Sequence, residues 1–480
     1  MITTLLIWLP IAAAIVVWIL PLSRYATGSL AVLVSLAEVG IWIEQAVRFD
    51  FTKTGLQFEE RGGWIKDLHV SYHVGVYGFS LWLVGLTVIA MAACTAYGFW
   101  VGRDRPRAYF GLMLFLTGAT VGVFVAQDLL LFYAFFEAML IPLYVLIGVW
   151  GGPGRLGATI KLLIYTMTGS LLMLAALIAY GLHAGTFDLV DGPQSISRWI
   201  FLGFMLAFVI KAPLFPFHGW LPDAYREAPP EVTAVLSGVI AKAGTYGMLR
   251  IAITKFPEPT SYYRTLILAL AAAALVYGSV LAFRSPDFRG VVAYSSLAQS
   301  GLIAIGLFSG SNLGYDGAVL QMVAHGLVST SLFLLAGTLE RRTTTGQFAL
   351  LGGMARGRPA LATMLMTIGI ISLAVPGSAA FAGEFLILAG AFQRAWWWAV
   401  IGGGAIVLAA MYMLRAISAV LHEARGSLVQ DEALDLRVGE LALLVPLLGA
   451  LLFLSAWPAG VSHHSFAGDD PAHAILGQFK

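Results

Sequence analysis

Four charged side chains stand inside stretches that are otherwise apolar for the length of a membrane-spanning helix: Glu137, Lys211, Lys242 and Glu384. Glu137, in "LLLFYAFFEAMLIPLYVLIGVW", is about 12 Å and about 20 Å from the two ends of its stretch at 1.5 Å per residue. Lys242, in "VLSGVIAKAGTYGMLR", is equally central. A charge at the middle of a bilayer costs roughly 2.5–3.5 kcal/mol on insertion scales and usually marks a functional pathway. We therefore predict that all four residues are functional.

A charge in an apolar helix can also belong to a structural ion pair, or to a long side chain that reaches the membrane surface. The side chain of Lys161, near the start of a predicted helix, can reach the membrane surface. Those of Glu137 and Lys242 cannot, because neither end of their helices is within reach. Two acids and two bases sum to zero charge, which favours groups that exchange protons along a line over a fixed site for one ion.

The residue types suit proton transfer. Burial disfavours a charged lysine and a neighbouring carboxylate favours it, so a lysine whose acid partner moves or takes up a proton can release its own near neutral pH. His218 and His325 are candidate relays between the carriers, although a histidine in a helix bundle can also be held by the backbone alone. Six other histidines fall in predicted loops or tails and are predicted to be solvated: His69, His73, His183, His463, His464 and His473.

Two helices that carry these charges are interrupted. Lys211 is followed by Pro213 and Pro216 in "VIKAPLFPFHGWLPDA", and Glu384 belongs to the Pro- and Gly-containing stretch "LAVPGSAAFAGEF". Proline breaks a helix, and the freed backbone groups require water or polar side chains. We therefore expect water to enter at the first break and Lys211 to act as a switchable proton carrier. Paired interrupted helices in two equivalent sets are typical of inverted-repeat transporters.

The composition indicates a polytopic membrane protein. Of 480 residues, 59% are hydrophobic and only 11% are charged, against about 25% charged residues in a soluble domain. We predict an all-α fold of about 14 transmembrane helices from the recurrence of apolar runs of spanning length. The expected helices are 2–20, 27–47, 76–98, 107–125, 128–149, 158–183, 197–226, 231–252, 262–283, 288–309, 315–339, 359–394, 397–422 and 438–457.

The interruptions in helices seven and twelve divide the chain into two inverted five-helix repeats, helices 4–8 and 9–13. The predicted parts are 1–106 (helices one to three and an outer loop), 107–252 (first repeat), 262–422 (second repeat) and 423–480 (last helix and C-terminal tail). The polar loop 48–75 alternates polar and apolar residues, and we expect a short hairpin in a solvated cap.

Orientation follows from the loops. The N-terminal stretch has no basic region before its apolar run, so we interpret it as a retained first helix rather than a cleaved signal. Loops on one side of the predicted membrane carry more Lys and Arg than loops on the other, and the positive-inside rule then places both termini on the outer side. Arg greatly outnumbers Lys, which we interpret as a bacterial, GC-rich source and hence the bacterial inner membrane.

Several kinds of site are not expected. A single cysteine, Cys94, cannot form an internal disulfide or a cysteine-ligated iron–sulfur cluster. His422-Glu423 lacks the second histidine of a zinc helix, and neither a Walker A loop nor a strand-linked GxGxxG is found. The net charge of +2 comes without a basic run. We therefore predict no cofactor or metal in this chain and no nucleic-acid partner.

Five motifs carry a family resemblance over residues 75–425: "FEAMLIPLYVLIGVWGG", "KAPLFPFHGWLPDAYREAPPEVTAVLSGVIAKAGTYGMLR", "VVAYSSLAQSGLIAIGLFSGS", "QMVAHGLVSTSLFLLAG" and "PGSAAFAGEF". The chain resembles the antiporter-like membrane subunits of respiratory complex I (NADH-quinone oxidoreductase), in the Mrp antiporter superfamily. Related L-type and N-type subunits, and the large antiporter subunits, usually carry lysine where this chain has Glu384. The M-type carries glutamate, so the resemblance favours that type.

The resemblance implies a fourteen-helix core, one proton channel per subunit, and L-type and N-type antiporter-like neighbours in the lipid bilayer. It also implies that Glu137 pairs with Lys211, that Lys242 is the central carrier, that Glu384 leads to the outer exit, and that quinone and redox centres belong to other subunits. One position departs from the pattern, because Gln299 stands where the family usually has histidine. Gln299 cannot titrate but can hold a water in the relay.

The function expected from these residues is proton translocation in the membrane arm of a bacterial NADH-quinone oxidoreductase, without redox centres in this chain. A subunit of a multisubunit cation/proton antiporter, or of a membrane-bound hydrogenase, is the alternative. A third hypothesis is a non-transporting scaffold that only holds neighbouring subunits. Such a scaffold would tolerate neutral substitution of Glu137 and Lys211 together.

Overall fold

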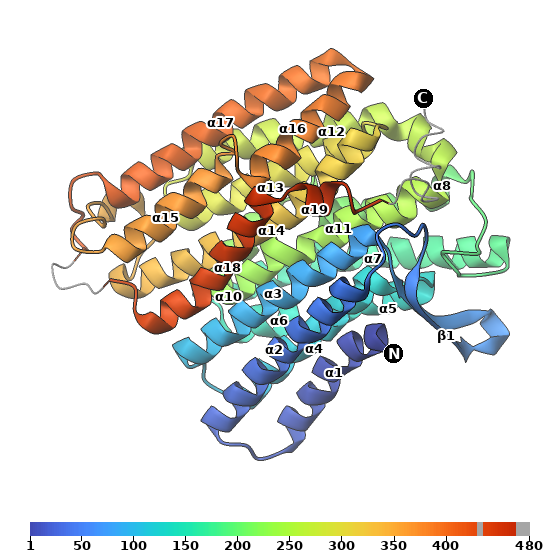
Figure 1. Cartoon of the computed structure of the whole chain (residues 1–480), viewed down its shortest axis with the longest axis horizontal. Coiled ribbons are helices and arrows are strands. Elements are labelled where there is room, and N and C mark those ends of the chain that lie inside the picture. Colours follow the sequence, from blue (N-terminus) through green and yellow to red (C-terminus); the bar gives the residue numbers. More distant parts are fainter. Residues whose placement is uncertain (430–434, 467–480) are drawn as a thin grey trace.

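The computed structural model describes residues 1–429 and 435–466, and most of this part of the chain is helical (Figure 1). Within it, 12 helices are long and apolar enough to cross a membrane. The polytopic helical architecture predicted from composition is therefore confirmed. Each predicted segment contains at least one helix, and most ends agree to within a few residues.

The helices before the first break are α1 (Ile2–Ile19), α2 (Arg24–Arg48), α3 (Gly78–Val101), α4 (Pro106–Val125), α5 (Leu129–Ala138), α6 (Leu140–Trp150) and α7 (Arg155–Ala184). The next are α8 (Arg198–Lys211), α9 (Leu221–Glu227), α10 (Pro230–Val235), η2 (Leu236–Ile240), α11 (Ala241–Gly247) and η3 (Met248–Ile253). The remainder are α12 (Pro257–Arg284), α13 (Phe288–Phe308), α14 (Asn312–Thr343), α15 (Pro359–Ser372), α16 (Ala379–Arg394), α17 (Trp396–Leu421), α18 (Val438–Ala456) and α19 (Ala459–Ser462), with short 3-10 turns η1 (Lys66–Leu68) and η4 (Phe348–Leu350).

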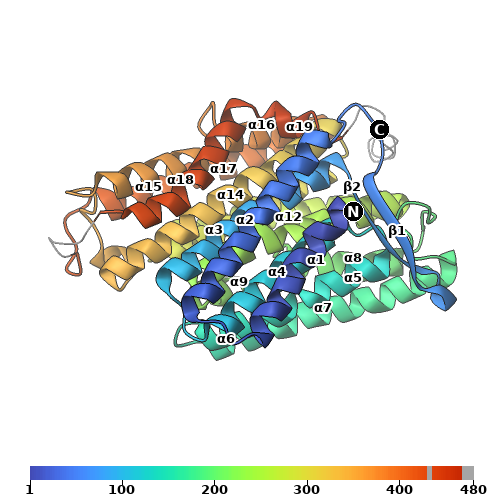
Figure 2. The ribbon, with the colours of Figure 1, turned by 60° about the horizontal axis from the view of Figure 1, so that its bottom comes forward.

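The long helices lie side by side in one bundle. Figure 2 shows α5 to α7 along one side of the bundle and α15 to α18 along the other. Three spans are almost fully enclosed by their neighbours: Pro230–Ile253, Phe288–Phe308 and Asn312–Thr343. These enclosed spans carry Lys242, Gln299 and His325, so the predicted central carrier and two predicted relay residues lie at the centre of the bundle.

Both predicted interruptions are present. The first separates α8 from α9 just after Lys211, and the Phe215–Pro216 peptide within it is cis. The second separates α15 from α16 and ends six residues before Glu384. Each helix end leaves backbone groups without helical partners, so both breaks bring polar backbone next to an ionisable side chain.

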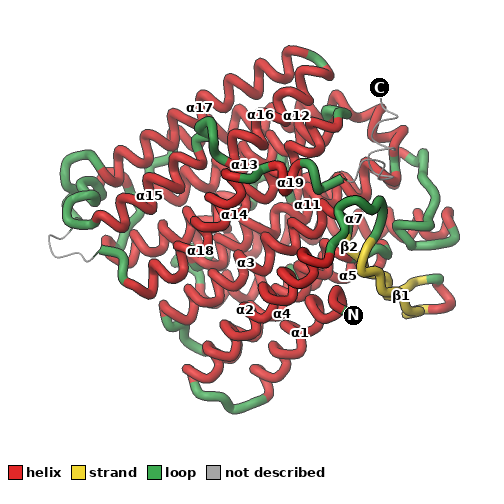
Figure 3. The backbone as a smooth tube through the Cα atoms, viewed as in Figure 1, coloured by secondary structure: helices red, strands yellow, loops and turns green. Residues whose placement is uncertain are grey.

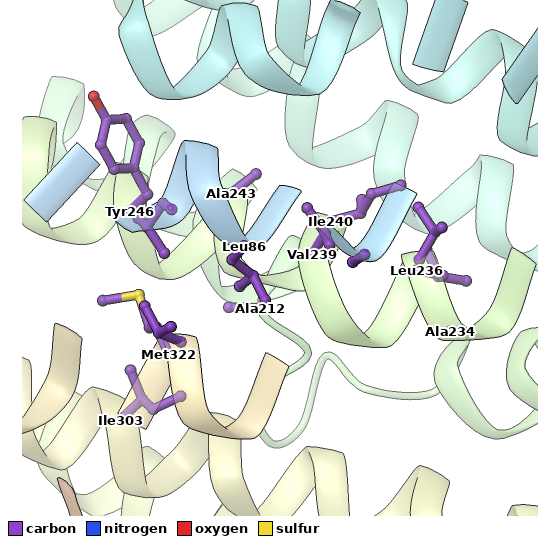
Figure 4. Packing of buried hydrophobic residues seen from close by; sticks show 14 of the residues in the cluster. Leu86, Ala212, Ala234, Leu236, Val239, Ile240, Ala243, Tyr246, Ile303 and Met322 are labelled. Atoms are coloured by element: carbon purple, nitrogen blue, oxygen red, sulfur yellow. The ribbon is translucent and has the colours of Figure 1, made fainter. Parts of the chain in front are cut away.

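A third irregularity was not predicted from the sequence. The segment expected as one helix over 231–252 alternates between α-helix and π-helix, with π-helical segments η2 and η3 on either side of α11, which carries Lys242. A π-helical turn widens the helix and frequently occurs at functional sites. Figure 4 shows Leu86 of α3 and Met322 of α14 among the side chains packed around this segment, next to its own Ala243.

Glycines let the central helices approach closely. A Cβ added to Gly326 of α14 would lie 2.7 Å from the carbonyl oxygen of Gly238 in η2 and 2.5 Å from Leu86 Cδ2. A Cβ added to Gly244 of α11 would lie 2.6 Å from the backbone nitrogen of Ala212 at the first break. The helix that carries Lys242 is therefore held against α14 on one side and against the first break on the other.

Loops gather at the two ends of the bundle, and the strands lie at one of them (Figure 3). Strands β1 (Gln57–Ile65) and β2 (Val70–Val76) pair antiparallel and form the hairpin expected in loop 48–75. This end is called the hairpin end below.

Because Gly326 touches backbone, we expect Gly326→Ala to force α14 away from η2 and to lower the stability of the protein by about 1–3 kcal/mol, the usual cost of overpacking. Thermal unfolding in detergent or nanodiscs measures the change. Gly404→Ala on α17 is the control, because its added Cβ meets nothing within 4 Å. Equal melting temperatures for the two variants would show that the close crossing is not required.

Candidate functional site

Lys242 is hydrogen-bonded to His325 at the centre of the bundle. Lys242 Nζ donates to the carbonyl oxygen of Ser237 at 2.8 Å and lies 2.8 Å from His325 Nδ1. Both side chains are buried, with exposed fractions of 2% for Lys242 and 6% for His325. The predicted carrier and the predicted relay are thus in direct contact, and one proton can be shared between an amine and an imidazole.

A group of hydroxyls lies next to this pair. Ser237 Oγ is 2.8 Å from Ser296 Oγ of α13 and 2.6 Å from Ser329 Oγ of α14. Each hydroxyl can both donate and accept a hydrogen bond. The serines therefore join η2, α13 and α14 by polar contacts where the surrounding side chains are mainly apolar.

Glu384 is held by two amides. Gln299 Nε2 donates to Glu384 Oε1 at 2.9 Å, and Gln321 Nε2 donates to Gln299 Oε1 at 2.7 Å. Glu384 is 2% exposed, and its Oε2 has no hydrogen-bond partner in the structure. Gln299, which stands where the resemblance leads us to expect histidine, therefore orients the carboxyl group while leaving one of its oxygens free.

A cavity connects the two halves of the site. Its lining combines apolar side chains with seven polar ones: Ser295, Gln299, Gln321, His325, Ser329, Tyr412 and, at the second break, Ser372. The cavity has a volume of about 20 Å³, which is enough for a buried water, since one needs roughly 10–15 Å³. Water can thus bridge the Lys242–His325 pair and the Gln299–Glu384 pair.

Glu137 and Lys211 are not paired as the resemblance implied. No acid of the described chain lies within salt-bridge distance of Lys211, although Glu137 is close enough to act on it electrostatically. The ammonium of Lys211 lies 4.8 Å from the ring centre of Phe136, in a cation–π contact, and the side chain is 4% exposed. Glu137 instead lines a cavity between α5, α6 and α7.

His218 stays apart from the central pair. It lies in the first break, where its ring packs on Phe215 and Tyr277 at centroid distances of 5.8 and 5.3 Å. Its Nδ1 has no hydrogen-bond partner in the structure. The structure therefore brings His325 to a carrier by direct contact but does not do so for His218.

One prediction about histidines is wrong. His73 of β2 was expected to be solvated, but it is fully buried, with Nδ1 2.6 Å from Asp188 Oδ2 and Nε2 2.9 Å from Glu59 Oε1. Arg61 also pairs with Asp188, at 3.0 Å. The hairpin folds back on the loop between α7 and α8, which a reading of local polarity along the sequence cannot show.

This buried cluster is connected to the helices that carry Lys242 and Glu137. The loop residue Leu189 donates its N–H to the Gln127 carbonyl at 2.7 Å, and Gln127 Oε1 accepts from Arg250 at 2.7 Å. Arg250 lies eight residues after Lys242, in η3. Asp128, the N-cap of α5, accepts from the N–H of Ser71 in β2 at 3.0 Å. The hairpin thus anchors the ends of the helices that carry Lys242 and Glu137.

Burial alone would raise the pKa of Asp188, but the hydrogen bond with His73 and those from the N–H groups of Asp191 and Val190 outweigh it and lower the pKa to about 2. A carboxylate whose pKa is lowered by folding stabilises the fold at pH values above its ordinary pKa. This stabilisation is lost as the pH falls towards the pKa in the folded protein.

Several site residues were missed in the sequence: Gln321, Ser237, Ser296, Ser329 and Tyr412. A signal for three of the site residues exists in "QMVAHGLVS", because Gln321, His325 and Ser329 are four residues apart and share one face of α14. The remaining residues come from separate helices, and only the packing brings them together.

Comparison with known proteins agrees with this geometry. The family model for the transmembrane region of NADH:quinone oxidoreductases and Mrp antiporters matches residues 126–429, which include all four candidate carriers. The chain belongs to this family.

Members of the NADH:quinone oxidoreductase/Mrp antiporter family are similar over nearly the whole chain. NADH-quinone oxidoreductase subunit M of Rhodobacter capsulatus is 36% identical over 448 residues, which cover 89% of this chain and 86% of that protein. A chain in the structure of respiratory complex I from Thermus thermophilus with bound NADH matches with a TM-score of 0.90 and 31% identity, covering 100% of this chain and 99% of that chain. A chain of the Mrp complex from a Dietzia species matches with a TM-score of 0.82 at 20% identity, which shows the fold alone.

We expect Gln299→Leu to destabilise the protein by about 1–3 kcal/mol. It removes the 2.9 Å hydrogen bond to the buried Glu384 carboxyl and leaves the Gln321 amide only its longer contact with Glu384, at 3.5 Å. Gln299→His keeps a donor at this position, as the resemblance suggests for relatives, and should retain most of the stability. Thermal unfolding compares the two variants. Equal destabilisation by leucine and histidine would show that the hydrogen bonds to Gln299 do not matter.

We expect Asp188→Asn to loosen the hairpin by on the order of 2 kcal/mol at neutral pH, since about two pKa units of stabilisation are lost. Hydrogen exchange of the β1–β2 amides measures this. The difference from the parent protein should shrink as the pH falls from about 4 towards 2, where Asp188 itself becomes protonated. The exposed Asp67→Asn at the hairpin tip is the control, and an equal effect there would contradict the assignment.

Proposed function

We propose that this chain is the M-type, proton-translocating membrane-arm subunit of a bacterial NADH-quinone oxidoreductase. The observation that carries the proposal is the contact of Lys242 with His325 in the most enclosed part of the bundle. His325 shares a cavity with Gln299, which donates to Glu384. Buried ionisable groups in a membrane are rare, and a connected line of them suits proton movement better than packing.

The geometry allows a specific sequence of proton transfers. The charged Lys242 donates to His325 Nδ1, and transfer of this proton leaves a neutral amine, still bonded to the Ser237 carbonyl, and an imidazolium. The imidazolium then releases the proton from its Nε2 into the polar cavity. The carboxylate of Glu384 accepts it on Oε2, while Gln299 holds Oε1. Gln299 orients the acceptor and does not itself carry the proton.

Glu137 and Lys211 form the first half of the line in this proposal. Their separation suits a switch, because a lysine released from its acid partner gives up its proton more readily. Lys211 lies close to α11 through the contact of Gly244 with Ala212, so a proton released there has a short route to Lys242. His218, at the first break, is proposed as a relay on the way in.

Further features of the proposal come from the family. We infer fourteen transmembrane helices in which helices 4–8 and 9–13 form inverted repeats around the two breaks, with both termini on the outer side of the bacterial inner membrane. L-type and N-type antiporter-like subunits are the proposed neighbours, and the cavity beside Glu137 is a surface that such a neighbour could cover. Nucleotide, quinone and redox centres are proposed to lie in other subunits.

We expect Lys242→Ala to abolish NADH-driven proton translocation through this subunit without preventing assembly, because the line loses its central carrier. The measurement is acidification of vesicles that contain the assembled complex, with a pH-sensitive dye. Lys66→Ala, in the exposed turn of the hairpin, is the control. An assembled Lys242→Ala complex that pumps at the parent rate would contradict the proposal. Sodium-dependent proton movement by the chain without redox partners would favour an antiporter instead.

A further inference from the structure

A second buried acid lies in the N-terminal helices, away from the central line. Glu38 is in the middle of α2 and is 0% exposed, although the sequence pattern did not single it out. Neither carboxyl oxygen has a hydrogen-bond partner in the structure. No charged side chain of the described residues lies within salt-bridge distance of Glu38. An ionised carboxylate in such surroundings is very costly and takes up a proton instead.

Further buried polar side chains share the face of α2 on which Glu38 lies: Thr27, Ser35 and Gln45. At 100° per residue, these positions fall within about 80° of one another around the helix. The opposite face of α2 exposes apolar side chains, among them Leu33, Leu36 and Ile43. The polar residues therefore form one inward-facing stripe, which is called the α2 stripe below.

The α2 stripe has the length of a membrane. Thr27 and Gln45 are 18 positions apart, or about 27 Å along the helix, close to the thickness of about 30 Å of the hydrocarbon core. Glu38 lies about 16 Å from one end and about 10 Å from the other. At the hairpin end, Gln45 Nε2 donates to Thr3 Oγ1 at 3.3 Å, and Thr3 donates to the carbonyl of Phe58 at 2.9 Å.

Helix α3 contributes a polar group beside the longest stretch of the α2 stripe without one, between Thr27 and Ser35. An added Cβ at Gly28 would touch Phe99 and one at Gly85 would touch Trp42, so α2 and α3 run antiparallel in a fixed register. This register places Thr95 opposite position 32, between Thr27 and Ser35. Thr95 is fully buried, and its Oγ1 has no hydrogen-bond partner in the structure. The hydroxyls of Thr27 and Ser35 likewise lack partners.

We propose that Glu38 is a second proton-binding position and that the α2 stripe carries protons through the N-terminal helices, beside the central line. The occupant is a proton on the carboxyl group, passed along hydroxyl and amide groups that can each donate and accept. The transfer needs no further reactant: an incoming proton binds one carboxylate oxygen, and the proton that leaves restores the carboxylate. This inference rests on the proposed function for the source of the protons.

The test compares Glu38→Gln with Glu44→Gln in the assembled complex. Glu44 is on the same helix but is exposed and paired with Arg48 at 2.7 Å. Infrared spectra at neutral pH should contain a protonated carboxyl band that is lost in Glu38→Gln and kept in Glu44→Gln. Glu38→Gln should also move fewer protons per NADH oxidised, and Glu38→Asp should recover part of the loss.

Ser35→Ala and Thr95→Val provide a second test, because they interrupt the α2 stripe and leave Glu38 in place. Both should lower the number of protons per NADH while the carboxyl band remains. No such band in the parent complex, or unchanged protons per NADH in Glu38→Gln, would overturn the inference. The infrared band is recorded without NADH, so it tests proton binding by Glu38 even if Lys242→Ala shows that the proposed function is wrong.

Discussion

The structure depends on the contacts that stabilise the ammonium group of a lysine inside a fully enclosed helix. Lys242 is stabilised by the carbonyl oxygen of Ser237 and by the ring of His325, and neither contact exists without a particular backbone arrangement. The π-helical segments widen the helix around Lys242, and the glycine contact between Gly238 and Gly326 brings α14 near enough for His325 to reach it. The hairpin anchors the far end of the same helix through Gln127 and Arg250.

Much of the fold was predictable because lipid allows few solutions. Long apolar runs predicted the spanning helices, and proline predicted both breaks, since it removes a donor and clashes with the preceding turn. The alternating polar loop predicted the hairpin. The π-helical segments around Lys242 were not predictable, because "VLSGVIAKAGTYGMLR" has ordinary helical periodicity. The segment packs closely against α14 and the first break, which lie far from it in the sequence or beyond a loop.

The site residues that were predictable are isolated charged or strongly polar groups in apolar helices. Those that were not predictable are polar residues that are common in helices. Lys242, His325, Gln299 and Glu384 were identified as isolated polar groups in apolar helices, and the structure joins them in two pairs. The serines and Gln321 are common residues whose role appears only when three helices meet. His73 was misjudged for the opposite reason, because a polar loop looks solvated until its partner loop is known. Glu38 was missed because α2 also carries exposed polar residues.

The central claim is that water joins the Lys242–His325 pair to the Gln299–Glu384 pair inside the membrane. A high-resolution electron cryomicroscopy map of the assembled complex in lipid nanodiscs examines this most directly. The account predicts ordered water density in the cavity lined by His325, Ser329 and Gln321, within hydrogen-bond distance of both pairs. A dry cavity closed by apolar side chains, with Glu384 turned towards the lipid, would contradict it.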